Sequence, residues 1–255
     1  MTPYHYTLKA AWPGRSETAA AVAGRFMDML SRLQSVDPVF TNWILLTDDQ
    51  ELELSLSEVE KNPVAWVEAN VARDEGEPFP AQGFRLYAAS NHGSTGYDLS
   101  RTPSLSVAAG SKFGNEIELD IGNMAVAADP TVIDGAAFEK VLLAIVAVWD
   151  CTWGSVRLSP QLDLNRRFPP GLVPSSYSQT GPWRLGWGMS WMAYLSASRA
   201  QELVIPYEIE AERLADGGIF LNTALARMDP DSPQHAAVSG LLSDILEKRA
   251  GDPVL

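Results

Sequence analysis

The segment between residues 134 and 149 constrains the fold most strongly, because as a helix it would be apolar on nearly every side. Asp134 is a suitable N-cap for this helix. A helix with so little polar surface has to be covered by other parts of the chain. Its longest apolar run, from Val141 to Trp149, is too short to cross a bilayer, so the segment predicts a buried, central helix. The residues that repeat at helical spacing along its main face are Phe138, Val141, Leu142, Ile145 and Trp149.

The segment from 115 to 121 predicts a strand with one buried face and one acidic face. Isoleucines and a leucine alternate there with Glu116, Glu118 and Asp120, and alternate side chains of a strand face opposite sides. The three carboxylates could gather a cation. A solvated strand face is the favoured interpretation, because no glycine-bounded loop is present to fold them around an ion. Turn residues separate this strand from earlier ones at 83–90 and 104–110, which favours an antiparallel meander.

Further strands are expected on both sides of this meander. In the segment 207–214, Ile209 and Ala211 are expected to face inward, and the turn Asp216-Gly217-Gly218 leads to a partner strand. The segment 189–195 is apolar on both faces, which predicts an inner strand. The other expected strands are 4–11, 153–158 and 219–223, and the segment 40–47 is either a short strand or an apolar loop.

The remaining helices complete the expected fold class. One follows an N-cap at Ser16, and the last lies between Ser232 and Gly251. Another runs from about Ser57 to Arg73, where Pro63 either interrupts the helix or marks a second start. Strands and helices are segregated rather than strictly alternating, so we expect an α+β fold: a mostly antiparallel sheet with four or five packing helices. Residues 1–255 are expected to form a single domain, although the proline-rich segment 159–182 would allow a boundary.

The charge of the chain favours basic partners. Its formal net charge is −13, which disfavours binding to nucleic acid and to anionic membranes. Between Asp48 and Glu77, ten acidic residues stand against two basic ones. Two interpretations fit this segment: a solvated face with a polar loop, or a docking surface for a basic protein. On the second interpretation the contact residues are Asp48, Asp49, Glu51, Glu53, Asp74, Glu75 and Glu77.

The sequence offers little sign of catalytic chemistry. The histidines His5, His92 and His235 are far apart and outside metal-binding motifs, and no hydrolase elbow, phosphate loop or dinucleotide motif occurs. We therefore expect no catalytic residues, no metal and no cofactor, with a hydrolase built from dispersed acids as a rival. Cys151 stands alone, which rules out an internal disulfide, and is expected to be a buried core residue. The N-terminus lacks the pattern of a signal peptide, so a cytoplasmic location is expected.

Three tryptophans leave a choice open. Trp183, Trp187 and Trp191 are spaced by four, which places their side chains on one face of a strand. Such a row is typical of a hydrophobic core, but it would also suit a surface on which a carbohydrate or another small ligand stacks. A small-ligand or carbohydrate-binding module is therefore the main alternative function.

Several segments together are similar to a known family. The opening, YTLKAAWPGR to TNW, and the later segments GMSWMAYLS, ADGGIFLNTA and DPDSPQHAAVSGLL resemble the bacterial polymorphic-toxin immunity proteins of family fifty-two over nearly the whole chain. Ser190 departs from that pattern, since the family usually has glycine there, and so does the acidic segment near 48–60. The residues that carry the resemblance are Trp12, Arg15, Arg25, Leu33, Asp37, Pro38, Phe40, Trp43, Trp191, Tyr194, Leu195, Ser196, Gly217, Gly218, Asp231, Pro233 and His235.

The resemblance implies a non-enzymatic antitoxin. Members of that family are made beside a secreted toxin, in settings that include type VI secretion, and bind the toxin in the producing cell. Their partners are typically nucleases with a restriction-endonuclease-like fold. A nuclease presents a basic, phosphate-seeking surface, which an acidic protein can occupy in place of nucleic acid. The expected partner is therefore a cognate toxin domain with a basic surface, bound without direct contact to nucleic acid or membrane.

Overall fold

One sheet organises the part of the chain that the computed structural model describes, namely residues 4–47, 53–90, 98–123, 126–160, 189–229 and 231–250. Neighbouring strands of this ten-stranded sheet pair antiparallel throughout. Across the sheet the order is β11 (Glu210–Arg213), β12 (Ile219–Asn222), β10 (Met189–Leu195), β9 (Trp153–Pro160), β1 (Tyr4–Trp12), β8 (Asn115–Ile121), β7 (Pro103–Ala109), β6 (Phe84–Ser90), β2 (Trp43–Leu46) and β3 (Glu53–Ser55).

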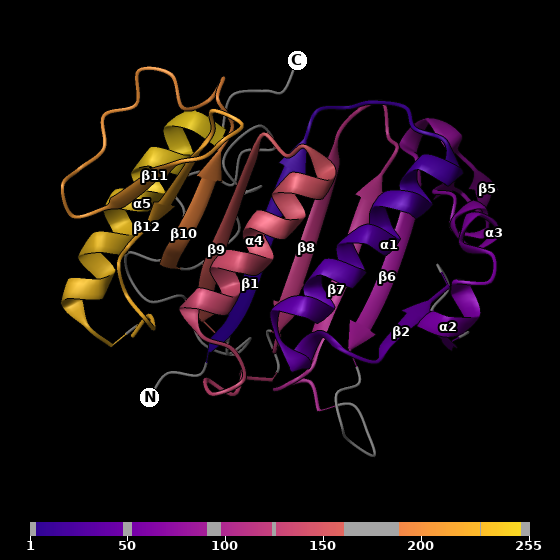
Figure 1. The fold of residues 1–255 in the computed structure, drawn as a ribbon, viewed down its shortest axis with the longest axis horizontal. Coiled ribbons are helices and arrows are strands. Elements are labelled where there is room, and N and C mark those ends of the chain that lie inside the picture. Colours follow the sequence, from indigo (N-terminus) through magenta and orange to yellow (C-terminus); the bar gives the residue numbers. More distant parts are fainter. Residues whose placement is uncertain are drawn as a thin grey trace.

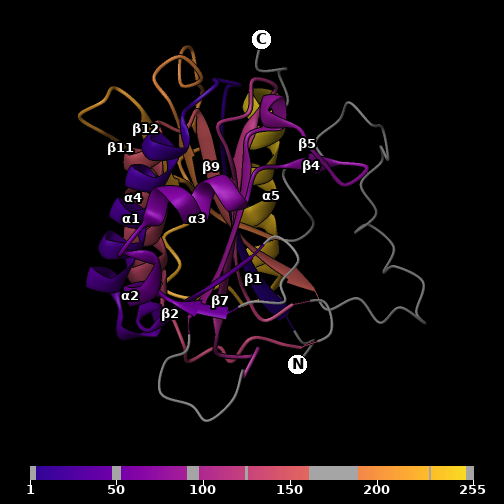
Figure 2. The ribbon, with the colours of Figure 1, turned by 90° about the vertical axis from the view of Figure 1, so that its right-hand side faces the viewer.

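Helices cover both faces of this sheet, though unequally. Two long helices, α1 and α4, lie on one face, and α5 lies on the opposite face near the β11 end (Figures 1 and 2). The α+β class, with a mostly antiparallel sheet and five helices, is thereby confirmed. The helices are α1 (Ala19–Val36), α2 (Leu56–Val59), α3 (Pro63–Ala69), α4 (Gly135–Trp149) and α5 (Pro233–Ala250), with 3-10 turns η1 (Pro38–Phe40) and η2 (Pro80–Gln82) and a small hairpin of β4 (Arg73–Asp74) and β5 (Glu77–Pro78).

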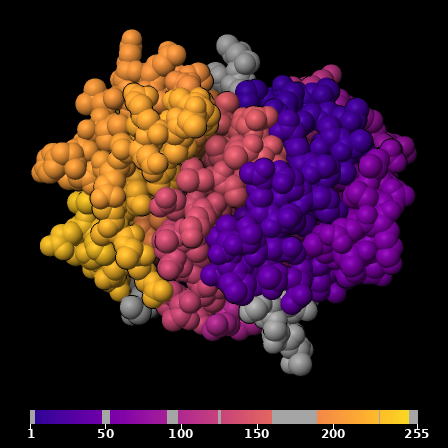
Figure 3. Space-filling view, viewed as in Figure 1, coloured from indigo at the N-terminus to yellow at the C-terminus, as the bar shows by residue number. Residues whose placement is uncertain are grey.

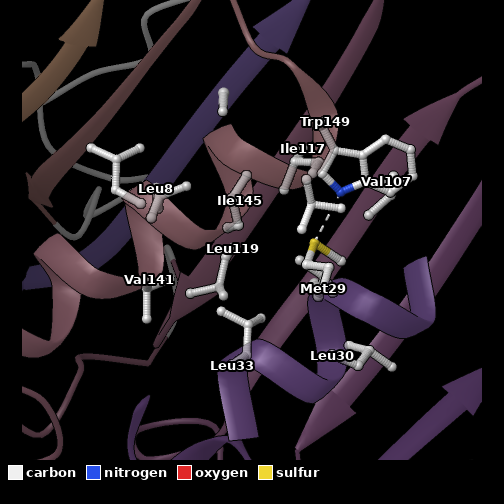
Figure 4. Close-up of a cluster of buried hydrophobic side chains, with 14 of the residues drawn as sticks. Leu8, Met29, Leu30, Leu33, Val107, Ile117, Leu119, Val141, Ile145 and Trp149 are labelled. Atoms are coloured by element: carbon white, nitrogen blue, oxygen red, sulfur yellow. Dashed lines mark hydrogen bonds between the residues drawn. The ribbon is translucent and has the colours of Figure 1, made fainter. Parts of the chain in front are cut away.

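Helix α4 is the buried central helix that its sequence predicts. The Asp134 side chain caps it by accepting a hydrogen bond of 2.8 Å from the main-chain N–H of Ala137. At its other end Trp149 is fully buried, stacks on Trp12 at 4.9 Å between ring centroids, and donates from Nε1 to the sulfur of Met29 at 3.2 Å (Figure 4). These contacts join β1, α1 and α4 in one core.

The face of the sheet under α1 and α4 is apolar across its central strands. Paired positions carry the same character across six strands because residues opposite each other in a ladder share a face. All six residues of one such row are buried. The row includes one of the apolar residues that alternate with acidic ones in the sequence of β8, and this alternation gives β8 its buried face. The row consists of Leu45, Ala88, Leu105, Leu119, Leu8 and Val156.

The opposite face has an apolar region under α5. Leu242, Ile245 and Leu246 of α5 pack there in a second buried cluster with Trp153 and Leu195 of the sheet. These three side chains form the buried face of α5. Among the described helices, none is long and apolar enough to span a membrane.

Four residues near the N-terminus of α1 and the C-terminus of α4 form an ion-pair junction. Arg15 and Arg25 each approach the Glu17 carboxylate at 3.3 Å and the Asp150 carboxylate at 3.1 and 2.9 Å, respectively. Both guanidinium groups also donate to carbonyl oxygens in the last turn of α4, at 3.1 and 2.7 Å. Cations are favourable at a helix C-terminus, where carbonyl groups lack partners within the helix. Arg15 and Arg25, which carry the family resemblance, therefore hold the fold together.

Three local predictions need correction. The N-cap of α1 is Thr18, whose hydroxyl accepts from Ala21 N at 3.2 Å, and not Ser16. The helix expected from Ser57 to Arg73 is divided as predicted, with a second helix that starts at Pro63, but it ends at Ala69 and not at Arg73. The buried amide of Asn70 donates to the Trp66 carbonyl at this end.

The third correction concerns Ala211, which is exposed rather than inward-facing, since it lies on the edge strand β11, where all four residues are exposed. Other expectations hold. The segment around Trp43 is a strand, and β10 lies between β9 and β12 as an inner strand. The turn at Gly217, whose φ is 82°, connects β11 to β12.

Candidate functional site

The structure describes four of the seven acidic residues proposed as contacts and places them in two regions. Asp48, Asp49 and Glu51 lie outside the described residues. Glu53 begins β3, at the outer edge of the sheet, and its side chain is exposed. Its place in the ladder, opposite Leu46, puts it on the face of the sheet that α1 and α4 do not cover.

The other three acidic residues occupy a tight hairpin. Asp74 and Glu77 pair across β4 and β5, and Glu75 adopts a positive φ of 49° in the turn between them. Arg73 stabilises the turn by donating to the Gly76 carbonyl at 3.0 Å. The hairpin projects from the rest of the molecule in Figure 2 and exposes all three carboxylates. The hairpin therefore holds three negative charges close together in the solvent.

The hairpin and Glu53 form two separate groups. Residues next to the hairpin join the start of β6, where Ala72 N donates to the Gly83 carbonyl at 2.8 Å. Glu53 instead aligns, through Leu46, with Tyr87 farther along β6. In Figure 1 the hairpin and β2 lie toward different ends of the sheet's right-hand edge.

Glu53 shares its face of the sheet with the acidic side of β8. The ladder runs from Tyr87 through Ser106 to Glu118 and then to Lys9 of β1. The Lys9 ammonium lies 2.7 Å from the Glu118 carboxylate, so opposite charges meet where the two strands pair. Sequence reasoning placed the Glu118 carboxylate on a solvated face but could not find this partner.

Asp120 is the unusual carboxyl group on this face. Burial raises its pKa to about 7, and the hydrogen bond from Thr7 Oγ1, at 2.6 Å, only partly offsets that effect. A raised pKa is a feature of catalytic acids, but it also arises in structural positions. The Asp120 and Glu118 carboxyl groups both have partners within the sheet, Thr7 for Asp120 and Lys9 for Glu118. Among the described residues, no group of three or more histidines, cysteines or acids is arranged to hold a metal ion.

Trp191, the described member of the tryptophan row, belongs to the core. It is fully buried, lies 5.7 Å from the ring of Phe138, and donates from Nε1 to the Leu225 carbonyl at 2.8 Å. No ligand can stack on an indole packed in this way. Trp183 and Trp187 lie outside the described residues, so the structure removes Trp191 alone from the ligand-stacking hypothesis.

The cysteine and the described histidines occupy structural positions. Cys151 is buried, as expected, and burial raises the pKa of its thiol, which disfavours the reactive thiolate. His235 accepts a hydrogen bond from Asp229 N at 2.9 Å, at the start of α5. Burial lowers the pKa of His5, which keeps its imidazole neutral.

One exposed surface was not found by sequence reasoning. Val204 and Tyr207 leave 86% and 96% of their surfaces open, in the segment that leads into β11. Tyr207 lies in the segment 207–214, whose alternation predicts a strand, and no motif marks Val204. Apolar character in a sequence normally signals burial, so the pattern alone contained nothing that marked these side chains as exposed.

Comparison with known proteins supplies a family and a similar fold. A model of the family described as Immunity protein 52 matches residues 4–251. No curated protein matches the chain. Among solved structures, the T6SS protein PA0821 of Pseudomonas aeruginosa is similar, with a TM-score of 0.50 and 10% sequence identity over 98% of this chain and 76% of that one. At this identity the similarity establishes the fold alone.

Proposed function

The chain belongs to the Immunity protein 52 family, and from that membership we propose that it binds a cognate secreted toxin and neutralises it without catalysis. The observation that carries this proposal is the family match over nearly the whole chain. Inhibition by binding needs a complementary surface and no reactive group. That requirement suits a protein whose Cys151, His235 and Trp191 all serve the fold.

The toxin that we propose is a nuclease acting in the cytoplasm of the producing cell. A nuclease needs a basic surface to hold the phosphates of its substrate. A chain with a formal charge of −13 attracts such a surface and raises the rate of encounter. The fold that the chain shares with a T6SS protein supports placing both toxin and inhibitor in a type VI secretion setting.

We further propose that acidic residues at the β3 end of the sheet draw in and contact the toxin. The β4–β5 hairpin supports this, because it holds its carboxylates in the solvent at a fixed place. Glu53 adds a carboxylate at the neighbouring edge of the sheet. The full set of proposed contacts is Asp48, Asp49, Glu51, Glu53, Asp74, Glu75 and Glu77.

The function is tested with the toxin encoded in the neighbouring reading frame. Expression of its C-terminal domain alone should stop growth, and co-expression of this chain should restore it. The purified chain should bind a catalytically inactive toxin domain and suppress nuclease activity of the active domain in proportion to the amount bound. Growth arrest that this chain does not relieve, together with no measurable binding, would refute the proposal.

The contact residues are tested by reversing their charge. The variant D74K/E77K should slow association with the toxin domain by about tenfold at low salt, and the difference should shrink as salt screens the charges. A matched control is D28K/E139K, which makes the same change of net charge on the helices α1 and α4. Equal effects of the two variants would show that net charge acts alone. The variant D48K/D49K/E51K/E53K tests the remaining contacts in the same assay.

A further inference from the structure

The described surface has few exposed large apolar side chains, and two of them lie in one short segment. The four are Leu99, Phe113, Val204 and Tyr207. Val204 and Tyr207 are the most exposed of the set and stand three positions apart. In Figures 1 and 3 the orange part of the chain that contains them forms the outer surface at one end of the molecule. Apolar groups gathered on an ordered surface commonly mark an interaction site.

The segment is held in place by its other side chains. Leu203 and Ile205 pack against the cluster beneath α5, and Ile209 is buried in it. Arg249 of α5 donates to the Glu202 carbonyl at 3.2 Å. Val204 lies between two inward-facing neighbours and therefore faces solvent. Binding a partner would cost little conformational entropy here, because the segment is already ordered.

A hollow of about 320 Å³ adjoins the segment on the side of α5. Its apolar lining comes from Leu203, Val204, Pro206, Leu241 and Ile245. Val204 forms part of this wall, and Tyr207 follows the wall directly in the chain. The two exposed side chains can pack against a partner, and the hollow beside them can receive a side chain of that partner.

Acidic residues outnumber basic ones in the segment that carries this apolar surface. Residues 202–216 include five acidic side chains against the single basic Arg213. Tyr207 hydrogen-bonds to the Glu208 side chain, which raises the pKa of the tyrosine. On the α5 side the rim carries Asp244 beside Lys248 and Arg249, but Arg249 is engaged with the Glu202 carbonyl. The other acidic residues of the segment are Glu202, Glu210, Glu212 and Asp216.

The other exposed apolar side chains lack this setting. Phe113 stands beside Lys112, whose ammonium lies 5.2 Å from the centre of its ring. The ammonium therefore already occupies one face of this aromatic ring. The acidic β3 end of the sheet, in turn, has no exposed large apolar side chain among its described residues. It suits electrostatic attraction better than tight packing.

We propose that Tyr207 and Val204, with the hollow beside α5, form the apolar centre of a second surface that binds the toxin, at the opposite edge of the sheet from the acidic residues near β3. This inference rests on the proposed function and names where its energetic centre lies. Tyrosines at the middle of an interface, surrounded by groups that exclude water, carry a large share of binding energy. The carboxylates around them meet the basic groups of the toxin at the rim.

A second copy of this chain is a poorer occupant. Two identical surfaces would bring the same carboxylates face to face, and like charges across an interface oppose association. The net charge of −13 adds to that repulsion. A basic toxin meets no such barrier.

The test measures binding kinetics of the full chain with the inactive toxin domain encoded beside it. The variant Y207A should speed dissociation by about tenfold or more, and V204A by about threefold, while association changes little. The control F113A truncates an exposed aromatic elsewhere and should leave dissociation within about twofold of the original protein, as surrounding or remote contacts usually do. The variant E210K/E212K should instead slow association at low salt.

The outcomes separate the two proposals. If the unaltered chain binds the toxin domain and Y207A binds equally well, the apolar centre lies elsewhere and this inference fails while the function stands. If the unaltered chain does not bind, the proposed function is wrong, and the inference is wrong too because it rests on that function. If the unaltered chain forms a dimer that Y207A disrupts, the surface serves a second copy and the inference is overturned. Because Val204 and Tyr207 are exposed, both variants should keep the circular dichroism spectrum and unfolding temperature of the original protein.

Discussion

Thr7 Oγ1 donates a hydrogen bond of 2.6 Å to the carboxyl group of Asp120, joining β1 to β8 in the middle of the sheet. Burial raises the pKa of Asp120 to about 7 in spite of this bond. In the unfolded chain the same group has a pKa of about 3.9. The folded protein therefore keeps a proton on Asp120 at pH values where the unfolded chain releases it.

The sign of the resulting pH dependence follows from linkage. A carboxyl group with a raised pKa in the folded state contributes stability below the unfolded pKa, and that contribution is lost as pH rises to the folded pKa. The variant D120N removes the titration and keeps an oxygen that can accept from Thr7. Its stability relative to the original protein should therefore rise by about 1 kcal/mol per pH unit between pH 5 and 7.

Urea denaturation at pH 5, 6, 7 and 8 checks this expectation. The gain from D120N should level off above pH 7, where Asp120 is already ionised in both states. The variant E116Q removes an exposed carboxylate from the same strand and serves as the control. A gain from D120N that does not change with pH would contradict the raised pKa.

Two glycines should respond in opposite directions to substitution by alanine. Gly83 has a φ of 74°, and a Cβ there would lie 2.1 Å from the Ala109 carbonyl oxygen, so G83A should lower the free energy of unfolding by about 2 kcal/mol or more. Gly24 lies on the exposed side of α1 with open space around it. G24A should raise the free energy of unfolding by about 0.5 to 1 kcal/mol, because alanine favours a helix. Thermal unfolding of both variants measures the contrast.

The junction at Asp150 should contribute modestly to stability. Desolvation opposes ionisation of Asp150, but hydrogen bonds from Arg25 and Arg15 outweigh it and lower its pKa. The variant D150N keeps a residue that tolerates the positive φ of 52° and loses the charge. It should cost about 1 kcal/mol, as expected for a partly exposed ion-pair network. The control D28N breaks an exposed pair with Arg32 on one helix and should change the denaturation midpoint far less.

Substitutions at Trp191 and Tyr207 should affect different properties, namely stability for Trp191 and toxin binding for Tyr207. W191F removes a buried hydrogen bond to the Leu225 carbonyl and some packing volume, so it should lower stability by about 2 kcal/mol. It should leave affinity for the toxin domain unchanged at temperatures where the variant is folded. Y207A should lower affinity for the toxin domain and leave the stability of the protein unchanged. A loss of toxin affinity in folded W191F would show that the core around β10 shapes the binding surface.

Much of the local structure could be predicted because its causes lie within a few residues. The Asp134 cap, the apolar repeat of α4 and the alternation of β8 depend on neighbours in the sequence, and each was confirmed. Predictions were wrong where a polar side-chain interaction that periodicity does not reveal set the end of a helix. Glu17 pairs with two arginines and stays outside α1, and Asn70 ends α3 by bonding to Trp66.

The candidate site could be predicted only in part. The sequence located the acidic segment and the family, and the hairpin carboxylates are exposed as a docking surface requires. It did not reveal Val204 and Tyr207, because exposure depends on which segments cover a side chain. Their neighbours Leu203 and Ile205 are equally apolar and pack inward.

The sequence by itself determined most of the long helices and strands, where several of them begin, and to which family the chain belongs. These properties follow from short-range periodicity, capping and turn chemistry. Only the tertiary structure decided that β1 lies between β8 and β9, that α5 covers one end of the second face, and that Asp120 is buried enough to hold a proton near neutral pH. Alternation shows that a strand has two faces, but what covers each face depends on contacts between residues more than a hundred positions apart, such as Thr7 and Asp120.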